Sequence, residues 1–160
     1  MEFAEFYARS RDDCLRAVLA SAGDMQTAEE LVAEAYARAL AGWRKVRKHP
    51  APQAWVVRTA LNLNVSAWRR HRRELPIDGL DAPAPTTGLD RVDAELMAAL
   101  LRLPVRQREV VALRIFLDLD TARTAEVLGI APGTVTAHLA RAIAALRGEF
   151  LTRSDRRTST

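Results

Sequence analysis

The chain of 160 residues contains a single cysteine, Cys14. One cysteine forms neither an intramolecular disulfide nor a cysteine-rich zinc site, so a disulfide-stapled secreted domain is excluded and a reducing compartment is indicated. We expect Cys14 to be a small residue of the core.

Groups that carry catalysis are also scarce. The three histidines, His49, His71 and His138, are far apart in the sequence. No His/Glu group has the spacing of metal ligands, and no glycine-rich phosphate loop is present. We therefore expect no metal, no cofactor and no enzyme activity, and an enzyme is the weakest of the alternatives.

Long hydrophobic runs are missing as well. No apolar stretch approaches the roughly 20 residues that cross a bilayer. The N-terminus, MEFAEFYARSRDD, has acidic residues where a signal peptide has a basic start and an apolar block. We expect a cytoplasmic protein without membrane insertion.

Lysine is nearly absent, because Lys45 and Lys48 are the only two among 24 basic residues. The others are arginines, whose planar guanidinium groups suit phosphate partners. The formal net charge of +4 is too small to identify the partner by itself. The positions of the arginines along the chain are therefore the more useful evidence.

A break in composition divides the chain. Residues 75–90, LPIDGLDAPAPTTGLD, contain three prolines, two glycines and no positive charge, which excludes a long helix. We expect a domain at 1–74, a linker at 75–90, a second domain at 91–148 and a flexible tail at 149–160. Such a linker would let both domains touch one extended partner.

Helical periodicity runs through both domains and no strand pattern competes with it, so the predicted fold class is all-α. In the first domain, one helix ends near Gly23. Thr27 to Glu30 then has the pattern of a capping box that opens the next helix. A third helix is expected from about residue 53 to residue 73.

Two helix faces of the first domain are polar. Glu29, Glu30 and Glu34 form an acidic patch, for which a solvated surface is the ordinary interpretation. The third helix carries Trp55, whose spacing is more typical of a core residue. It ends in the arginine run Arg69 to Arg73, which either neutralises phosphates or is merely a solvated helix end.

The most informative stretch is residues 120–147, DTARTAEVLGIAPGTVTAHLARAIAALR. It predicts two short helices joined at Gly129, which suits a left-handed helix end, with Pro132 in the first turn of the second helix. The polar face of that second helix carries Thr134, Thr136, His138 and Arg141. Such groups can read base edges or phosphates in a major groove, so the pattern indicates a helix-turn-helix. A plain helical hairpin in a bundle is the alternative.

Both domains together resemble one family. Extracytoplasmic-function (ECF) sigma factors of the sigma-70 superfamily have a first conserved domain similar to TAEELVAEAYARALAGWRKV and PQAWVVRTALNLNVSAWRRHRRE. Their second domain is similar to LPVRQREVVALRIFLDL and AEVLGIAPGTVTAHLARAIAALR. The resemblance implies an initiation factor that binds core RNA polymerase and promoter DNA at the minus-ten and minus-thirty-five elements. It also implies that an anti-sigma factor can be a partner, since many members are held by one.

The resemblance assigns roles to residues. For the core polymerase contact it implies Glu30, Leu31 and Glu34. For the minus-ten element it implies that the loop from Arg47 to Gln53 and the helix after it capture an unpaired base, with Asn62 as the base contact. It also implies backbone contacts by Arg58, Arg69, Arg70, Arg72 and Arg73. For the minus-thirty-five element it implies Arg114, Thr134, Thr136, His138 and Arg141.

Some positions depart from the family's usual pattern. Ala131 replaces the usual serine N-cap of the recognition helix, a change that typically costs about 0.5 to 2 kcal/mol. Thr136 stands where a lysine or arginine is common, which removes an expected phosphate contact. Arg123 replaces a glutamate, so we expect Asp120 to act as an N-cap without a reciprocal capping box.

An autonomous helix-turn-helix regulator remains the principal alternative. Its N-terminal half would sense a ligand or dimerise, and it would bind duplex DNA without polymerase. That reading leaves the helix rich in arginine and asparagine unexplained.

Overall fold

The computed structural model describes the backbone of residues 1–74 and 91–158 and the side chains of residues 1–64, 94–152 and 154–156. Every regular element in these ranges is a helix, so the all-α prediction is confirmed. The linker predicted at residues 75–90 lies outside the described residues.

The first unit is a bundle of three long helices and one short one. Its elements are α1 (Phe3–Ala22), α2 (Met25–Ala41), α3 (Trp43–Val46) and α4 (Pro52–Glu74). Helices α1, α2 and α4 pack pairwise, and Cys14, Val18 and Val57 are fully buried among them. Cys14 is thus a core residue, as predicted, and burial raises the pKa of its thiol to about 11.

The turn between α1 and α2 differs from the predicted capping box. Helix α1 ends at Gly23 with a φ of 76°. Asp24 is the N-cap of α2, because its carboxylate accepts a hydrogen bond of 2.8 Å from the Thr27 amide. The Thr27 hydroxyl donates to the same carboxylate. The prediction that Thr27 opens the helix with Glu30 is therefore wrong, since a carboxylate three residues earlier already satisfies the Thr27 amide.

The second unit contains five elements. They are α5 (Arg91–Arg102), α6 (Val105–Val111), the π-helical segment η1 (Ala112–Phe116), α7 (Thr121–Leu128) and α8 (Pro132–Thr158). Helices α6 and α7 both pack against α8. The helix that begins at Val105 does not stay α-helical, because its second half, Ala112–Phe116, widens into a π turn. Asp118, with a φ of 53°, then begins the loop to α7.

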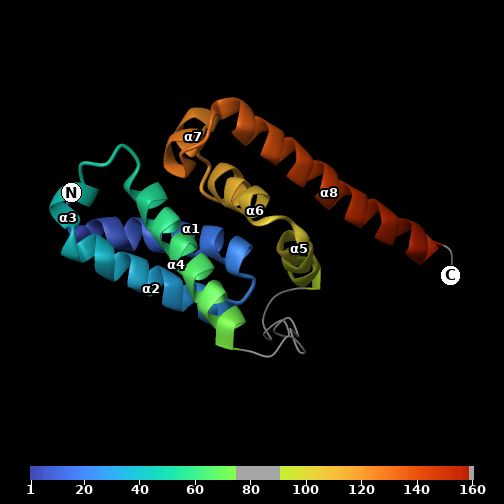
Figure 1. The fold of residues 1–160 in the computed structure, drawn as a ribbon, viewed down its shortest axis with the longest axis horizontal. Coiled ribbons are helices and arrows are strands. Elements are labelled where there is room, and N and C mark those ends of the chain that lie inside the picture. Colours follow the sequence, from blue (N-terminus) through green and yellow to red (C-terminus); the bar gives the residue numbers. More distant parts are fainter. Residues whose placement is uncertain (75–90, 159–160) are drawn as a thin grey trace.

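Helix α8 is longer than predicted. We expected a flexible tail at residues 149–160, but the helix continues to Thr158, and Figure 1 shows it extending beyond α5. Arg102 of α5 donates to Glu149 through Nε at 2.9 Å and also through Nη2. This contact across 47 residues of sequence holds the helix at the position where a tail was predicted.

The two units pack against each other along α1 (Figure 1). Helix α1 contacts α2 and α4 in its own unit and α5, α6 and η1 in the other, while α4 contacts α7. A single apolar cluster contains Phe6 and Val57 of the first unit together with Leu113 and Leu128 of the second. The units therefore share one core.

Candidate nucleic-acid interface

Helices α7 and α8 form the predicted helix-turn-helix. Asp120 caps α7 by accepting a hydrogen bond of 2.7 Å from the Arg123 amide. Gly129 ends α7 with a φ of 65°. The Ile130 amide donates to the Ala125 carbonyl at 3.1 Å, which is the long hydrogen bond of a Schellman motif. Helix α8 begins with the predicted proline, so the turn chemistry is confirmed.

The N-terminal turns of α8 have two distinct faces. Val135 and Ala142 are fully buried against the rest of the protein. Thr134, Thr136 and Arg141 are exposed. A helix that follows such a turn and presents an exposed polar face has the form that enters a major groove.

His138 lies at the border between these faces. Its side chain is half-buried, and its Nδ1 is buried without a hydrogen-bond partner among the described residues. The imidazole is thus turned partly toward the protein, and only part of the ring is accessible to DNA.

The arginines before the helix-turn-helix differ in how far they are exposed. Arg106 is exposed. Arg108 is half-buried and donates from Nη1 to the Leu101 carbonyl at 3.1 Å, and burial lowers the pKa of its guanidinium. Arg114 is also half-buried and donates to the Leu119 carbonyl. Arg114, predicted as a DNA contact, therefore braces the loop that leads into α7.

Helix α4 carries the residues predicted for the minus-ten element. Asn62 is exposed on it, and Arg58, about one turn earlier, is half-buried with its Nη1 hidden from solvent. The helix backbone continues through the arginine run to Glu74. The side chains of that run, Arg69, Arg70, Arg72 and Arg73, are outside the described ones.

A cavity of about 400 Å³ lies between α2 and α4 beside Asn62. Its lining residues are Arg38, Trp55, Thr59, Asn62 and Leu63. Trp55 packs against the core and also forms a wall of this cavity. The prediction of a core tryptophan is therefore only part of what Trp55 does.

The outer face of α2 is acidic at its start. Glu30 and Glu34 are exposed, and Glu34 pairs with Arg38 at 2.9 Å. Leu31, which the family resemblance groups with them, is only 9% exposed and packs into the core.

Helix α2 also presents a large apolar side chain to solvent, that of Leu40, which is 56% exposed. The sequence reasoning missed it. Leu40 follows Leu31 by nine positions, about two and a half turns of a helix with 3.6 residues per turn, so the two side chains lie on opposite faces. That spacing is a signal that places Leu40 opposite the core-facing stripe.

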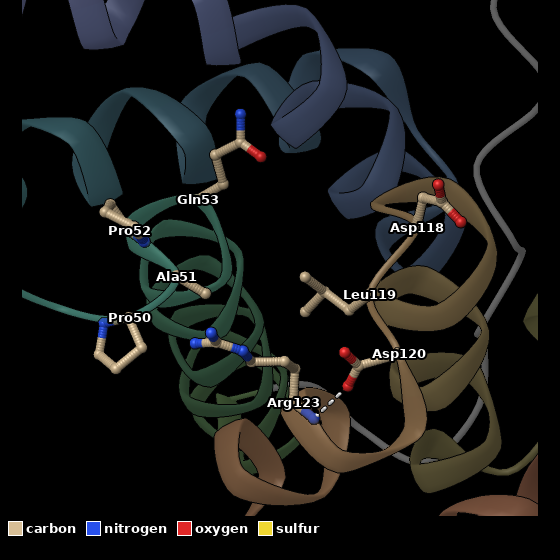
Figure 2. A pocket seen from close by; sticks show the side chains of 8 residues that line it. All are labelled: Pro50, Ala51, Pro52, Gln53, Asp118, Leu119, Asp120 and Arg123. Carbon is tan, nitrogen blue, oxygen red and sulfur yellow. Dashed lines mark hydrogen bonds between the residues drawn. The ribbon is translucent and has the colours of Figure 1, made fainter.

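A second cavity, of about 390 Å³, lies at the junction of the two units. Its lining comes from the loop before α4 and the segment leading into α7: Pro50, Ala51, Pro52, Gln53, Asp118, Leu119, Asp120 and Arg123. Figure 2 shows the Arg123 side chain extending from α7 toward Pro50 and Ala51. The loop predicted to capture a promoter base therefore lies across one cavity from the helix-turn-helix.

Within the described ranges, no group of three or more His, Cys, Asp or Glu side chains could hold a metal ion. In the same ranges, no single helix has the length and hydropathy to cross a membrane, and only the bent pair of α7 and α8 passes such a test jointly.

Two family models match the chain in the order of its two units. Sigma-70 region 2 matches residues 6–74, and Sigma-70, region 4 matches residues 93–146. The RNA polymerase sigma-E factor of Streptomyces coelicolor is 31% identical over 156 residues, covering 96% of this chain and 88% of that protein. The protein of the same name from Streptomyces antibioticus is 34% identical over 156 residues, with 96% and 87% covered.

Solved structures agree in fold. The sigma factor RpoE of Bartonella quintana, in complex with the anti-sigma factor NepR, has a TM-score of 0.76 at 20% identity, covering 91% of this chain and 94% of that one. CnrH, in complex with the cytosolic domain of CnrY, has a TM-score of 0.66 at 22% identity, with 94% and 88% covered. At these identities the likeness concerns the two-unit fold alone.

Both units match a sigma-70 region, and these relatives are named RNA polymerase sigma factors, which favours a sigma factor over an autonomous regulator. The chain therefore belongs to the ECF sigma factors of the sigma-70 family, the initiation factors that direct RNA polymerase to specific promoters.

Proposed function

We propose that the two units divide the promoter between them. Helix α8 reads the minus-thirty-five element as duplex DNA, and α4 with the loop before it binds the minus-ten element as an opened strand. The observation that carries this division is that one chain presents two separate polar surfaces. One is the exposed face of a helix-turn-helix, and the other is a helix with a cavity beside an exposed amide.

At the minus-thirty-five element, Thr134, Thr136 and Arg141 make the contacts, because they are exposed on the N-terminal turns of α8. A guanidinium can bind guanine through two hydrogen bonds, and hydroxyl groups can bind either bases or phosphates. His138 contributes through the accessible part of its ring. Arg114 acts mainly by holding the Leu119 carbonyl, which positions α7 beneath α8.

At the minus-ten element, Asn62 contacts a base, and the cavity beside it accepts part of an unpaired nucleotide. The cavity offers an aromatic wall from Trp55 and polar groups from Thr59 and Asn62, the combination that holds single-stranded bases by stacking and hydrogen bonding. The strand backbone is neutralised by Arg58, Arg69, Arg70, Arg72 and Arg73.

Core polymerase binds the outer face of α2. Glu30 and Glu34 supply exposed carboxylates, and Leu40 supplies an exposed apolar side chain on the same helix. Leu31 supports this face from the core side. Protein interfaces combine exposed charged groups at the rim with apolar groups at the centre.

An anti-sigma factor is a further proposed partner. Support comes from the two solved structures of similar fold, whose titles name NepR and CnrY as bound partners. The chain performs no catalytic step of its own in this scheme and works where polymerase works, in the cell interior.

Permanganate probing of unpaired thymines tests the division of labour. With core polymerase and a promoter fragment, we expect thymines near the minus-ten element to become reactive. Asn62→Ala should reduce that reactivity while leaving protection of the minus-thirty-five element unchanged, and Asn64→Ala on the same helix is the matched control. Equal reactivity in both variants would contradict the role of Asn62.

A further inference from the structure

The cavity beside Asn62 has two walls of different chemistry. Helix α4 contributes the ring of Trp55, the hydroxyl of Thr59 and the amide of Asn62, whereas α2 contributes Arg38. The Thr59 hydroxyl donates to the Trp55 carbonyl at 2.8 Å, so its proton is already used within α4. Among the residues that line this cavity, Arg38 is therefore the one with a charge.

The guanidinium of Arg38 is only partly engaged. Its Nε donates at 2.9 Å to Oε1 of Glu34, which lies one turn earlier on α2. Nη1 and Nη2 have no partner within the described part of the chain, and 55% of the side chain is exposed. An exposed ion pair of this kind holds a side chain only weakly, so the two terminal nitrogens remain open to an anion.

A nucleotide that enters this cavity brings a negative charge with it. An aromatic ring and an amide bind a base by stacking and hydrogen bonding, but they do not neutralise the phosphate attached to it. Arg58 of α4 is half-buried and its Nη1 is hidden from solvent, so that nitrogen does not reach a phosphate. The open nitrogens of Arg38 do, because a planar guanidinium offers pairs of N–H groups that match phosphate oxygens.

We propose that Arg38 binds the phosphate of the nucleotide whose base lies in the cavity, so that α2 holds the strand backbone while α4 holds the base. This inference rests on the proposed function of the cavity at the minus-ten element. It gives α2 a DNA contact in addition to its polymerase contact, within one turn of the helix. Glu34 affects the strand only through its charge, which opposes a phosphate held by Arg38.

Binding of single-stranded DNA by the holoenzyme measures this contact. The probe is an oligonucleotide with the non-template minus-ten sequence of a promoter that the holoenzyme selects from a library, and core polymerase is saturated with each variant. We expect Arg38→Gln to weaken binding about tenfold, as for the loss of a charge-assisted hydrogen bond. The slope of log affinity against log salt concentration should become shallower by about 0.7, the value for one phosphate contact on a single strand.

Arg9→Gln is the matched control. Arg9 is also exposed and pairs at 2.9 Å with a carboxylate four residues earlier, that of Glu5, but it lies on α1 and does not line the cavity. It should change neither the affinity nor the salt slope. Arg38→Lys keeps the charge without the planar fork, so it should keep the salt slope and recover part of the affinity. Equal affinity of the Arg38→Gln and Arg9→Gln holoenzymes would overturn the proposal.

Uncharged phosphates in the probe distinguish direct binding from indirect support. Replacing one phosphate at a time by a methylphosphonate should weaken binding of the wild type at several positions. At one of these, Arg38→Gln should bind the charged and uncharged probes equally, because its contact with that phosphate is already lost. If the effects of the two changes add at every position, Arg38 does not bind a phosphate and the proposal is wrong.

Glu34→Gln separates a DNA contact from an effect through the polymerase-binding face of α2. It removes the carboxylate and leaves the guanidinium, so strand binding at saturating polymerase should stay the same or become stronger. A loss equal to that of Arg38→Gln would show that Arg38 acts through Glu34, contrary to the proposal. If the wild-type holoenzyme selects no promoter, or Asn62→Ala leaves strand binding unchanged, the proposed function itself fails and the inference falls with it.

Discussion

Arginine side chains have different tasks in this molecule according to how far they are buried. Arg141 is exposed on α8, whereas Arg108 and Arg114 are half-buried and donate to the carbonyls of Leu101 and Leu119. A half-buried guanidinium that binds a carbonyl stabilises a loop, while an exposed one is available to a base or phosphate. Of Arg108, Arg114 and Arg141, Arg141 is therefore the one to test as a DNA contact.

Replacing Arg141 with alanine should weaken discrimination at one or two base pairs of the minus-thirty-five element by about 1 to 3 kcal/mol, as expected for the loss of a base contact. The measurement is the affinity of the holoenzyme for a set of single-base promoter variants. Arg147→Ala, at an exposed position of the same helix, is the control. A loss that is uniform across all the variants would show that Arg141 binds a phosphate instead.

Glu30→Lys should lower the affinity for core polymerase while leaving the fold intact, because it reverses a charge on the exposed face of α2. A surface plasmon resonance titration in the absence of DNA measures the effect. Asp12→Lys makes the same reversal on the exposed side of α1 and should change little. If both variants bind equally well, the acidic patch is only a solvated surface.

Asp24 gives the chain a pH dependence that can be isolated. Hydrogen bonds from the Thr27 hydroxyl and amide lower its pKa below the ordinary value of 3.8. The cap therefore contributes stability above about pH 4 and loses it as the pH falls through the lower folded value. Asparagine caps a helix about as well and does not titrate. The stability of the wild type relative to Asp24→Asn, from urea unfolding, should fall between about pH 5 and pH 3, and a constant difference would refute this.

At the level of elements, two glycines end helices in the left-handed conformation but differ in their surroundings. A Cβ on Gly129 would meet no atom within 4 Å, whereas one on Gly23 would collide with Leu101. A residue with a Cβ pays the same cost for the left-handed backbone at both sites. The difference between the destabilisation at Gly23 and that at Gly129 therefore measures the contact of α1 with Leu101 of the other unit.

Gly129→Ala should destabilise the chain by about 1 to 2 kcal/mol, the cost of a left-handed conformation for a residue with a Cβ. Gly23→Ala should cost more, and Leu101→Ala should relieve part of the excess in the double variant. Thermal or urea unfolding of the four proteins gives the coupling energy. Strict additivity of Gly23→Ala and Leu101→Ala would contradict the contact.

Local chemistry explains which elements the sequence could predict. Gly129 and Asp120 act on neighbours within a few residues, so the helix-turn-helix could be predicted together with its caps. The start of α2 was misjudged because Asp24 and Thr27 are both acceptable N-caps, and only the hydrogen bond between them decides. The end of α8 depends on Glu149 meeting Arg102, 47 residues away, which local patterns do not contain.

The residues of the candidate site could also be predicted only in part. Exposure of Thr134 and Arg141 follows from helical periodicity, and the structure agrees. The inward positions of Leu31 and Arg114 do not follow from the family pattern, because family resemblance assigns a contact without saying how much of the side chain is accessible. Leu40 was missed since no motif includes it.

At the scale of the whole molecule, the packing of the two units could not be predicted from either unit. It joins α1 to η1 and α5 across roughly half of the chain, while the sequence suggested two separate domains on a linker.

Promoter-specific run-off transcription tests the central claim most directly. Purified core polymerase, this chain and a library of promoter fragments are combined, and the transcripts are sequenced. The account predicts transcripts that start at defined positions, depend on the chain, and are lost when either the minus-ten or the minus-thirty-five element is replaced. Transcription that is the same with and without the chain, together with no association between the chain and core polymerase, would contradict it.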